Sequence, residues 1–476
     1  MYLKNGLIYL LAKLTPALSS FVLLAAYTRW MTTEEYGVLS TTMVVASSVC
    51  MFTFSWLYIG IMRFWESQQI DRAELGALIS TSVIVISGIV GLFAVLFAIV
   101  TGQVEVAIVF WLLFVSVALF EAWQRINAIT RQAGRYLWAE LGRTLVTMLA
   151  GLLLVWLGYA WQGAAAAVIL GMLLVLAVSG AWRYWSFPRQ HNNLQVLKKL
   201  LVYGLPLSLS LALLEVVNTA DRVMIGWLLG YGRAGEYAVA YNLPFQVLMM
   251  VTGSLNLAAY PFVIRALEQE GKPAAIRQLR QYFVILMAAA VPAVFGLLAV
   301  AELLIPLLIG TDFVAAALSL LPWISIAVFA NCSYVFYVSL SFQLAEQTTG
   351  ALKVAVLAAL INVLLNLLLI PEYGLWGAVI ASIAAYMVCL VAGFYLGRRH
   401  FALEVPWSDL AKVMLAAAAM YLFLQAMPSP GWGAVYQLVL KIIAGVTVYA
   451  ALVWLLNIAD VRQQLAVQLS LWRCRA

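Results

Sequence analysis

The chain has 476 residues, of which 65% are hydrophobic and 10% are charged, and its formal net charge is +7. Soluble domains are usually about 45–50% apolar and about 25% charged, so this composition excludes a soluble globular protein and indicates a polytopic membrane protein. The basic residues stand in short segments between apolar runs and form no basic domain, which excludes nucleic acid as a partner.

Fourteen apolar runs, bounded by charged residues, Gly or Pro, are long enough to cross a bilayer as helices. The predicted spans are residues 7–28, 38–62, 77–100, 104–124, 137–158, 162–182, 200–229, 236–262, 281–303, 315–340, 351–370, 374–396, 411–427 and 433–457. Runs of about 20 apolar residues predict helices, because barrel strands would alternate over roughly 10 residues. The predicted fold is an all-α membrane protein with fourteen transmembrane helices.

The basic residues predict the orientation of these spans. If the N-terminus is cytoplasmic and the spans alternate, 21 of the 27 Lys and Arg residues lie inside and only Arg29 and Arg233 lie outside. Positive residues concentrate in cytoplasmic loops, so this split predicts that both termini are cytoplasmic. The remaining four, Lys13, Arg143, Arg222 and Lys441, lie within spans.

Three short motifs recur at nearly constant offsets. Glu35-Tyr36 recurs as Glu236-Tyr237, Arg63 matches Arg265, and Gly163-Ala164 matches Gly377-Ala378, at offsets of 201, 202 and 214 residues. Six spans per copy give two parallel repeats, which predicts an N-lobe at 1–199, a C-lobe at 200–400, and two further helices with a cytoplasmic tail at 401–476. Parallel repeats place a substrate site at their interface near the bilayer midplane and alternate its access by rocking.

Polar side chains on the first five spans are the first candidates for a site. Asn5, Tyr9, Lys13, Pro16 and Ser20 form one stripe on the first span, although Lys13 is close enough to the span's start to reach the interface instead. Arg63 follows the second span. Glu121 and Arg125 have the i,i+4 spacing of a structural pair, whereas Glu140 and Arg143 either face a cavity or simply neutralise each other at i,i+3.

The seventh span, Ser208 to Gly230, carries the densest group of polar residues. Ser208, Leu211, Glu215, Asn218 and Arg222 share one helical face, and Asp221 lies beside it. A charge at the centre of a membrane costs roughly 2.5–3.5 kcal/mol even on lenient scales, so these side chains need partners or water. We expect this face to line a polar cavity; the alternative is a local Asp221–Arg222 pair without a cavity.

The eighth span adds a stripe of polar and aromatic residues. Its members are Asn242, Phe245, Met249, Thr252, Asn256 and Tyr260. Hydrogen-bonding and flat aromatic side chains suit a glycan path, but Asn and Thr also hold membrane helices together. Both interpretations stay open for this stripe.

Several segments together resemble a known family. The runs LKNGLIYLLAKLTPALSSFVLL, TTEEYGVLS, RFWES, NTADRVMIGWLLG, EYAVAYNL and IPEYGLWGAVIAS are similar to the lipid-linked oligosaccharide flippases of the multidrug/oligosaccharidyl-lipid/polysaccharide exporter superfamily. The resemblance extends over essentially the whole chain. It implies a V-shaped bundle of fourteen helices with two lobes, like that of the superfamily's multidrug transporters.

The resemblance implies transport and not enzymatic activity. The expected substrate is an undecaprenyl-(pyro)phosphate-linked oligosaccharide, moved from the cytoplasmic to the periplasmic leaflet of the bacterial inner membrane for cell-surface polysaccharide. Membrane lipids and a polysaccharide polymerase or export machinery are the other expected partners. No Gly-rich phosphate loop or metal motif accompanies the two histidines, which argues against an enzyme.

Charge assigns roles to the candidate residues. A lipid phosphate cannot cross hydrocarbon bare, so Lys13, Arg63, Arg143 and Arg222 are candidates for the phosphate, with Asn218, Asn242, Asn256 and Tyr260 for the glycan. No cofactor is expected, but Glu215, Asp221, Glu140 and Glu121 are candidates for binding a coupling proton or sodium ion. The alternative is a multidrug or cation antiporter of the same superfamily, which would have twelve spans and an acid-dominated cavity.

Overall fold

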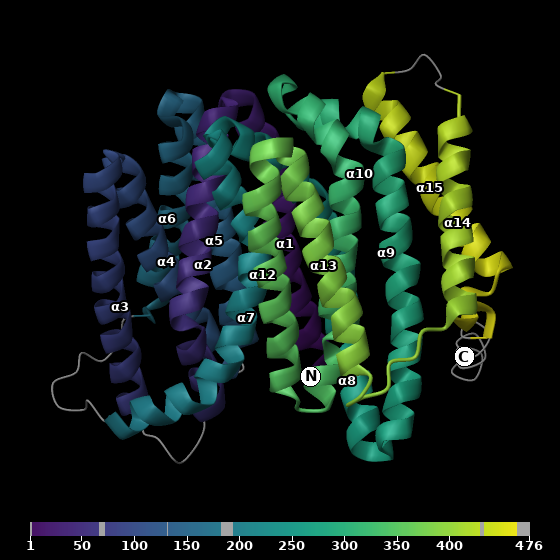
Figure 1. The fold of residues 1–476 in the computed structure, drawn as a ribbon, viewed down its shortest axis with the longest axis horizontal. Helices are drawn as coiled ribbons and strands as arrows, with labels where there is room; N and C mark the ends of the chain where they lie inside the picture. Colours follow the sequence, from purple (N-terminus) through teal and green to yellow (C-terminus); the bar gives the residue numbers. More distant parts are fainter. Residues whose placement is uncertain (1, 66–71, 131, 182–193, 429–432, 464–476) are drawn as a thin grey trace. The chain divides into compact units, whose positions relative to one another are not determined.

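All regular structure in the described part of the chain is helical. The computed structural model describes every residue except 1, 66–71, 131, 182–193, 429–432 and 464–476. Its helices (Figure 1) are α1 (Tyr2–Trp30), α2 (Thr33–Phe64), α3 (Arg72–Thr101), α4 (Val104–Ile129), α5 (Ala133–Leu154), α6 (Ala160–Ser179), α7 (Leu194–Leu229), α8 (Tyr231–Glu270), α9 (Lys272–Leu308), α10 (Thr311–Ser333), α11 (Leu340–Leu344), α12 (Thr348–Tyr373), α13 (Leu375–Gly397), α14 (Trp407–Ala426) and α15 (Ala434–Leu455). Short π-helical turns follow α5 and α10 at Val155–Tyr159 and Tyr334–Val338, and a 3-10 turn follows α15 at Ile458–Asp460. The all-α prediction is confirmed for these residues.

Many of these helices can cross a bilayer. Among the described residues, eleven are long and apolar enough, or up to twelve if α7, which bends between Leu205 and Ser208, is one span. One of the eleven is the 46-residue stretch Gly134–Ser179, which holds both α5 and α6. Its backbone leaves the helical region at Gly158 (φ 92°) and Ala160 (φ 38°), and α5 packs against α6, so the stretch is a helical hairpin. A multi-pass membrane protein is confirmed, and the total of fourteen spans stays a prediction.

The helices group into two compact units. The first comprises residues 1–239 and 352–385, and the second comprises residues 240–351 and 386–476, so α8, α12 and α13 contribute to both. The lobes predicted from the repeat, at 1–199 and 200–400 with 401–476 outside them, have other boundaries. Those lobes and their V-shaped arrangement stay a prediction.

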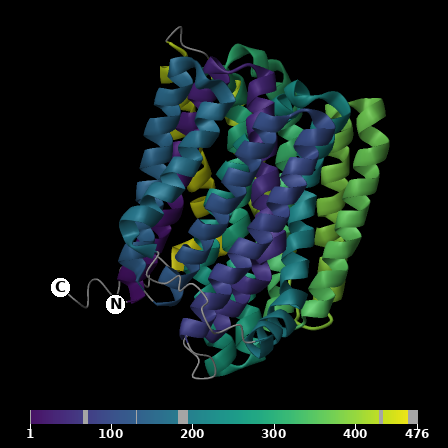
Figure 2. The same ribbon diagram turned by 90° about the vertical axis from the view of Figure 1, so that its left-hand side faces the viewer.

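In the first unit, α2 packs against α7, α4 and α6, while α1 packs against α5 and α3 against α4 (Figure 2). Glycines allow some of these helices to touch through their backbones. A Cβ atom at Gly204 of α7 would lie 2.3 Å from the carbonyl oxygen of Trp56 on α2. Lipid provides no hydrophobic drive for helix association, so close packing through small residues is what holds such helices together.

The turns before α2, α4, α6 and α8 lie at one end of the first unit. Tyr231, which opens α8, donates to Gln103 in the α3–α4 turn at 3.4 Å, and Gln162 at the start of α6 donates to Glu105 at 3.1 Å. A Cβ atom at Gly37 of α2 would lie 1.8 Å from the carbonyl oxygen of Tyr231, so the starts of α2 and α8 are in backbone contact. Consecutive helices here therefore alternate in direction, as the predicted topology requires. Which end faces the cytoplasm stays a prediction.

The second unit is built around α9, which packs against α10, α14 and α15. Ala299 of α9 forms a buried apolar cluster with Met420 and Leu424 of α14. Tyr449 of α15 donates to the carbonyl oxygen of Ala288 on α9 at 2.8 Å. These contacts attach the two C-terminal helices to the rest of the unit.

The outer surface of α3 is apolar. Leu92, Phe93, Ile99 and Val100 are all largely exposed along this helix. Soluble monomers rarely expose contiguous apolar patches larger than a few hundred Å². Lipid is the solvent that such a surface requires.

Candidate functional site

A buried carboxylate lies at the centre of the candidate site in the first unit. Asp221 of α7 is 0% exposed. Its Oδ2 accepts hydrogen bonds from the hydroxyls of Tyr237 on α8 at 2.5 Å and Ser382 on α13 at 3.0 Å, and its Oδ1 accepts from the backbone N–H of Arg222 at 2.9 Å. Hydrogen bonds to an ionised acceptor are roughly twice as strong as neutral ones, so three donors reduce the cost of burying this group.

The other polar residues of α7 form a network with α2. Ser48 of α2 donates to Glu215 at 3.5 Å and to Thr219 at 3.3 Å, and the Asn218 side-chain amide donates to Glu215 at 3.5 Å. Arg222 is 8% exposed and interacts electrostatically with both Glu215 and Asp221. The structure thus brings together four of the predicted residues on α7, and the cavity predicted beside them stays a prediction.

Arg143 and Glu140 form a second charged group in the first unit. The guanidinium of Arg143 donates to Glu140 at 2.7 Å, and Gln124 of α4 donates to the same carboxylate at 2.9 Å. Arg143 also lies over the ring of Phe120, 5.2 Å from its centroid. The ion pair that the spacing offered is present, and Arg143 also lines a cavity of about 310 Å³. A role of Arg143 in binding substrate stays a prediction.

Arg63, Glu121 and Lys13 are the other predicted residues of the first unit. Arg63 is exposed at the end of α2, and Glu121 pairs with Arg125 at 3.1 Å on an exposed surface, as the spacing predicts for a structural pair. The side chain of Lys13 on α1 lies outside the described residues.

The stripe on α8 belongs to the second unit. Asn256 accepts a hydrogen bond from the hydroxyl of Tyr282 on α9 at 3.1 Å, which is a contact between neighbouring helices. Asn242 and Tyr260 are half-buried on the same helix. Their roles in binding a glycan stay a prediction.

The sequence did not identify the partners of Asp221. Tyr237 was visible only as part of the repeated Glu-Tyr motif, and Ser382 lies 161 residues from Asp221 in the chain. The recurrence of the Glu-Tyr pair was a sequence signal that marked Tyr237. In the structure its counterpart Tyr36 is buried as well.

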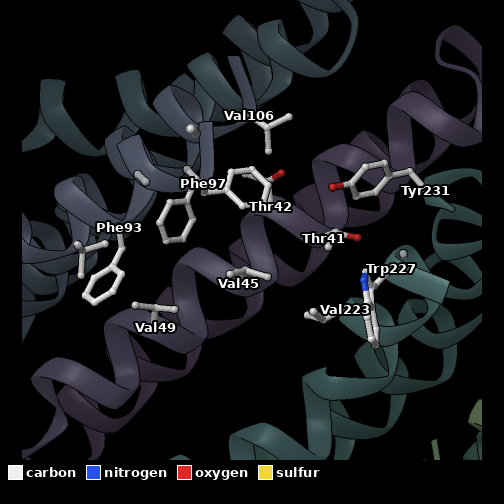
Figure 3. Close-up of a pocket in the computed structure, with 15 residues that line it drawn as sticks. Thr41, Thr42, Val45, Val49, Phe93, Phe97, Val106, Val223, Trp227 and Tyr231 are labelled. Atoms are coloured by element: carbon white, nitrogen blue, oxygen red, sulfur yellow. The ribbon is translucent and has the colours of Figure 1, made fainter. Parts of the chain in front are cut away.

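A larger apolar cavity also lies in the first unit. It measures about 580 Å³ and lies between α2, α3, α4, α7 and the first residue of α8. In Figure 3, Phe93 and Phe97 of α3 approach it from one side and Val223 and Trp227 of α7 from the other, with α2 running between them. Thr41, Thr42 and Tyr231 are polar residues in its wall.

Comparisons with known proteins agree with this architecture. A family model described as polysaccharide biosynthesis protein matches residues 2–267, which is more than half of the chain. No curated protein matches the sequence.

The fold is similar to that of solved transporters. A structure of the lipid II flippase MurJ in an inward closed conformation matches with a TM-score of 0.75 at 12% identity, over 94% of this chain and 98% of that chain. An inward-facing multidrug resistance transporter of the MATE family in the MOP superfamily matches with a TM-score of 0.58 at 16% identity, over 82% of this chain and 93% of that chain. These two matches show the fold alone. The family model confirms the polysaccharide family that the sequence motifs predicted, and the chain belongs to the polysaccharide biosynthesis protein family.

Proposed function

We propose that this protein flips an undecaprenyl-(pyro)phosphate-linked oligosaccharide from the cytoplasmic to the outer leaflet of the bacterial inner membrane. The product would supply a cell-surface polysaccharide such as an exopolysaccharide, O-antigen or capsule. Family membership and the flippase-like fold support a transporter of this class. The observation that carries the proposal is Arg222, a cation buried inside a membrane-spanning unit next to two carboxylates.

A protein that transports a lipid phosphate needs a positively charged side chain that faces the protein interior and not the lipid. An anionic headgroup loses its hydration as it enters the membrane, and a guanidinium replaces water with paired N–H donors. Glu215 and Asp221 interact electrostatically with Arg222, and a phosphate would compete with them for its charge. Lys13, Arg63 and Arg143 remain further candidates for this anion, although Glu140 already neutralises Arg143.

The Asp221 group suits a coupling ion. A carboxylate with two hydroxyls offers the oxygen ligands that a proton or a sodium ion prefers. Binding of a cation there would replace hydrogen bonds that Tyr237 and Ser382 now donate. Glu215 is the second candidate on α7, whereas Glu121 is engaged by Arg125 on the surface.

A flipping assay with the purified protein tests the proposal. The protein is reconstituted in vesicles with a fluorescent polyprenyl-pyrophosphate-linked sugar, and a membrane-impermeant quencher reports the exposed fraction. We expect wild-type protein to move the label between leaflets and Arg222→Ala to leave it where it started. Equal rates for protein-free and wild-type vesicles would contradict the proposal.

The second candidate is a multidrug or cation antiporter. The MATE-family structure of similar fold favours it. Uptake of an organic cation such as ethidium, driven by an ion gradient, would identify that activity, and its absence would favour the flippase.

A further inference from the structure

The start of α7 turns across one end of the first unit. Leu194–Leu205 makes an angle of 51° with Ser208–Leu229, and Figure 1 shows it lying across the lower end of the helices. The distribution of basic residues predicts that this end is cytoplasmic. A segment that bends at the end of a membrane span lies near the boundary between hydrocarbon and lipid headgroups.

One face of this segment packs against the end of α2. Leu200 is 0% exposed, and a Cβ atom at Gly60 of α2 would lie 2.7 Å from its side chain. The ring of Tyr203 meets that of Phe64 edge-on, with 5.7 Å between the two centroids. These contacts hold the segment against α2, so its opposite face is left to the surroundings of the protein.

An apolar cavity of about 290 Å³ lies between this segment, α2 and α3. Its wall includes Trp56 of α2, Leu194 and Leu197 of α7, and residues of α3 from Leu78 to Ile86. Those two residues of α3 are eight positions apart, so the cavity follows the helix for about 12 Å at about 1.5 Å per residue. One leaflet contributes about half of the roughly 30 Å hydrocarbon thickness, so this length suits most of one acyl chain.

The cavity opens toward lipid. Val85 and Leu194 in its wall are 52% and 77% exposed, and Val85 continues the apolar outer surface of α3. Hydrocarbon is therefore the solvent that reaches this opening from the membrane. A chain that enters gains dispersion contacts with the wall, which an empty space would forfeit.

Two lysines lie at the headgroup end of the cavity. Lys198 and Lys199 are exposed, and neither forms an ion pair with a carboxylate of the described residues. Lys198 follows Leu194 by four residues, and helical side chains lean toward the N-terminus, so Lys198 extends over Leu194 at the cavity. Basic residues at a membrane surface attract anionic lipids, whereas a zwitterionic headgroup offers them no net charge.

We propose that the cavity and the two lysines form a site for one resident anionic phospholipid. One acyl chain fills the cavity, and the phosphate lies at Lys198 and Lys199. The bound lipid holds the bent start of α7 against α3. The polyprenyl tail of the expected substrate is far longer than this cavity, whereas an acyl chain matches it, so the site is distinct from the proposed phosphate site at Arg222.

Thermal unfolding of the purified full chain in a neutral detergent tests this proposal. The probes are phosphatidylglycerol, phosphatidylcholine with the same acyl chains, undecaprenyl phosphate and sodium phosphate. A ligand that binds only the folded state raises its Tm. We expect phosphatidylglycerol to raise the Tm by about 2 °C more than phosphatidylcholine does, and sodium phosphate to have no such effect, because it lacks the chain.

Three variants locate the binding. The double variant Lys198→Gln with Lys199→Gln removes the charge and Val85→Trp fills the cavity, so both should lose the shift that is specific to phosphatidylglycerol. Arg398→Gln with Arg399→Gln is the matched control, because it removes two consecutive exposed cations just after α13, and it should keep the shift. Any shift that undecaprenyl phosphate produces should be the same in the lysine variant as in wild type.

Five results would overturn the proposal. They are no shift specific to phosphatidylglycerol, a shift that survives in the lysine variant or in Val85→Trp, an equal loss in the arginine control, an equal shift with sodium phosphate, and loss of an undecaprenyl phosphate shift in the lysine variant. The last result would place the transported lipid at this site. If phosphatidylglycerol fails while Arg222→Ala still abolishes flipping, the phospholipid site is wrong and the proposed function stands.

Discussion

The hydroxyl of Tyr237 donates a 2.5 Å hydrogen bond to Asp221 and so connects the start of α8 to α7. A hydrogen bond to a charged acceptor contributes about 1.5–3 kcal/mol, so Tyr237→Phe should destabilise the folded state by that amount and lower the Tm. The matched control is Tyr241→Phe, which breaks a 2.9 Å bond to the neutral hydroxyl of Tyr386 and should cost about 1 kcal/mol. A larger loss in the control would contradict the role assigned to Tyr237.

Arg222→Ala should abolish surface glycan in cells that depend on this protein, because the proposed phosphate site loses its buried cation. Immunoblotting of the membrane fraction establishes that the variant is present, and glycan staining measures the product. Arg233→Ala is the control and should leave glycan unchanged, since Arg233 forms an exposed pair with Glu236 at 2.6 Å. Wild-type glycan with Arg222→Ala would remove this residue from the mechanism.

Asp221→Asn keeps the shape of the side chain and removes its charge. If Asp221 binds the coupling ion, flipping by wild-type protein should accelerate with an imposed proton or sodium gradient, and the variant should lose that acceleration. Asp312→Asn, at the exposed start of α10, is the control and should respond as wild type does. A variant that still follows the gradient would place the ion elsewhere.

Gly37→Ala should disturb the contact between the starts of α2 and α8. The new Cβ would lie 1.8 Å from the carbonyl oxygen of Tyr231, and neither backbone can yield as a side chain would. Overpacking usually costs about 1–3 kcal/mol, and we expect the upper end of that range in a thermal unfolding experiment. Gly88→Ala on α3 is the matched control, since its Cβ meets nothing within 4 Å, and it should be neutral or stabilising.

Accessibility labelling tests the predicted orientation. A cysteine introduced at Gly102 should react with a membrane-impermeant reagent added outside intact cells, and one at Lys272 should react only after permeabilisation. The positive-inside distribution is the reason for this expectation. Outside labelling at Lys272 would overturn the span assignment and the repeat together.

Composition and run length were sufficient to predict the fold class, because water and lipid select so strongly between apolar and charged residues. Interactions within one helix were equally accessible. Helical spacing places Glu140 beside Arg143 and Glu121 beside Arg125, and both ion pairs are present in the structure.

Contacts between helices were not accessible from the sequence. Spacing along α7 identified Asp221, but its partner Ser382 is 161 residues away, and no periodicity connects the two. The cavity beside Arg143 was missed in the same way, since five helices form its wall and Tyr27 and Thr144 carry no local signature. The predicted lobe boundary between residues 199 and 200 came from repeated motifs and puts α2 and most of α7 in different lobes. In the structure α7 packs against α2, and both belong to the first unit.

The contact of Gly37 and Gly235 has a consequence for a transporter that must change shape in every cycle. Cβ atoms at these glycines would lie 1.8 Å from the carbonyl oxygen of Tyr231 and 2.1 Å from that of Thr33, so main-chain atoms form the contact, and no ion pair among the described residues joins the two helix starts. Each pair of touching atoms gains only about 0.1–0.2 kcal/mol, and separating them exposes no unpaired charge. A side chain larger than glycine at either position would therefore keep the starts of α2 and α8 apart.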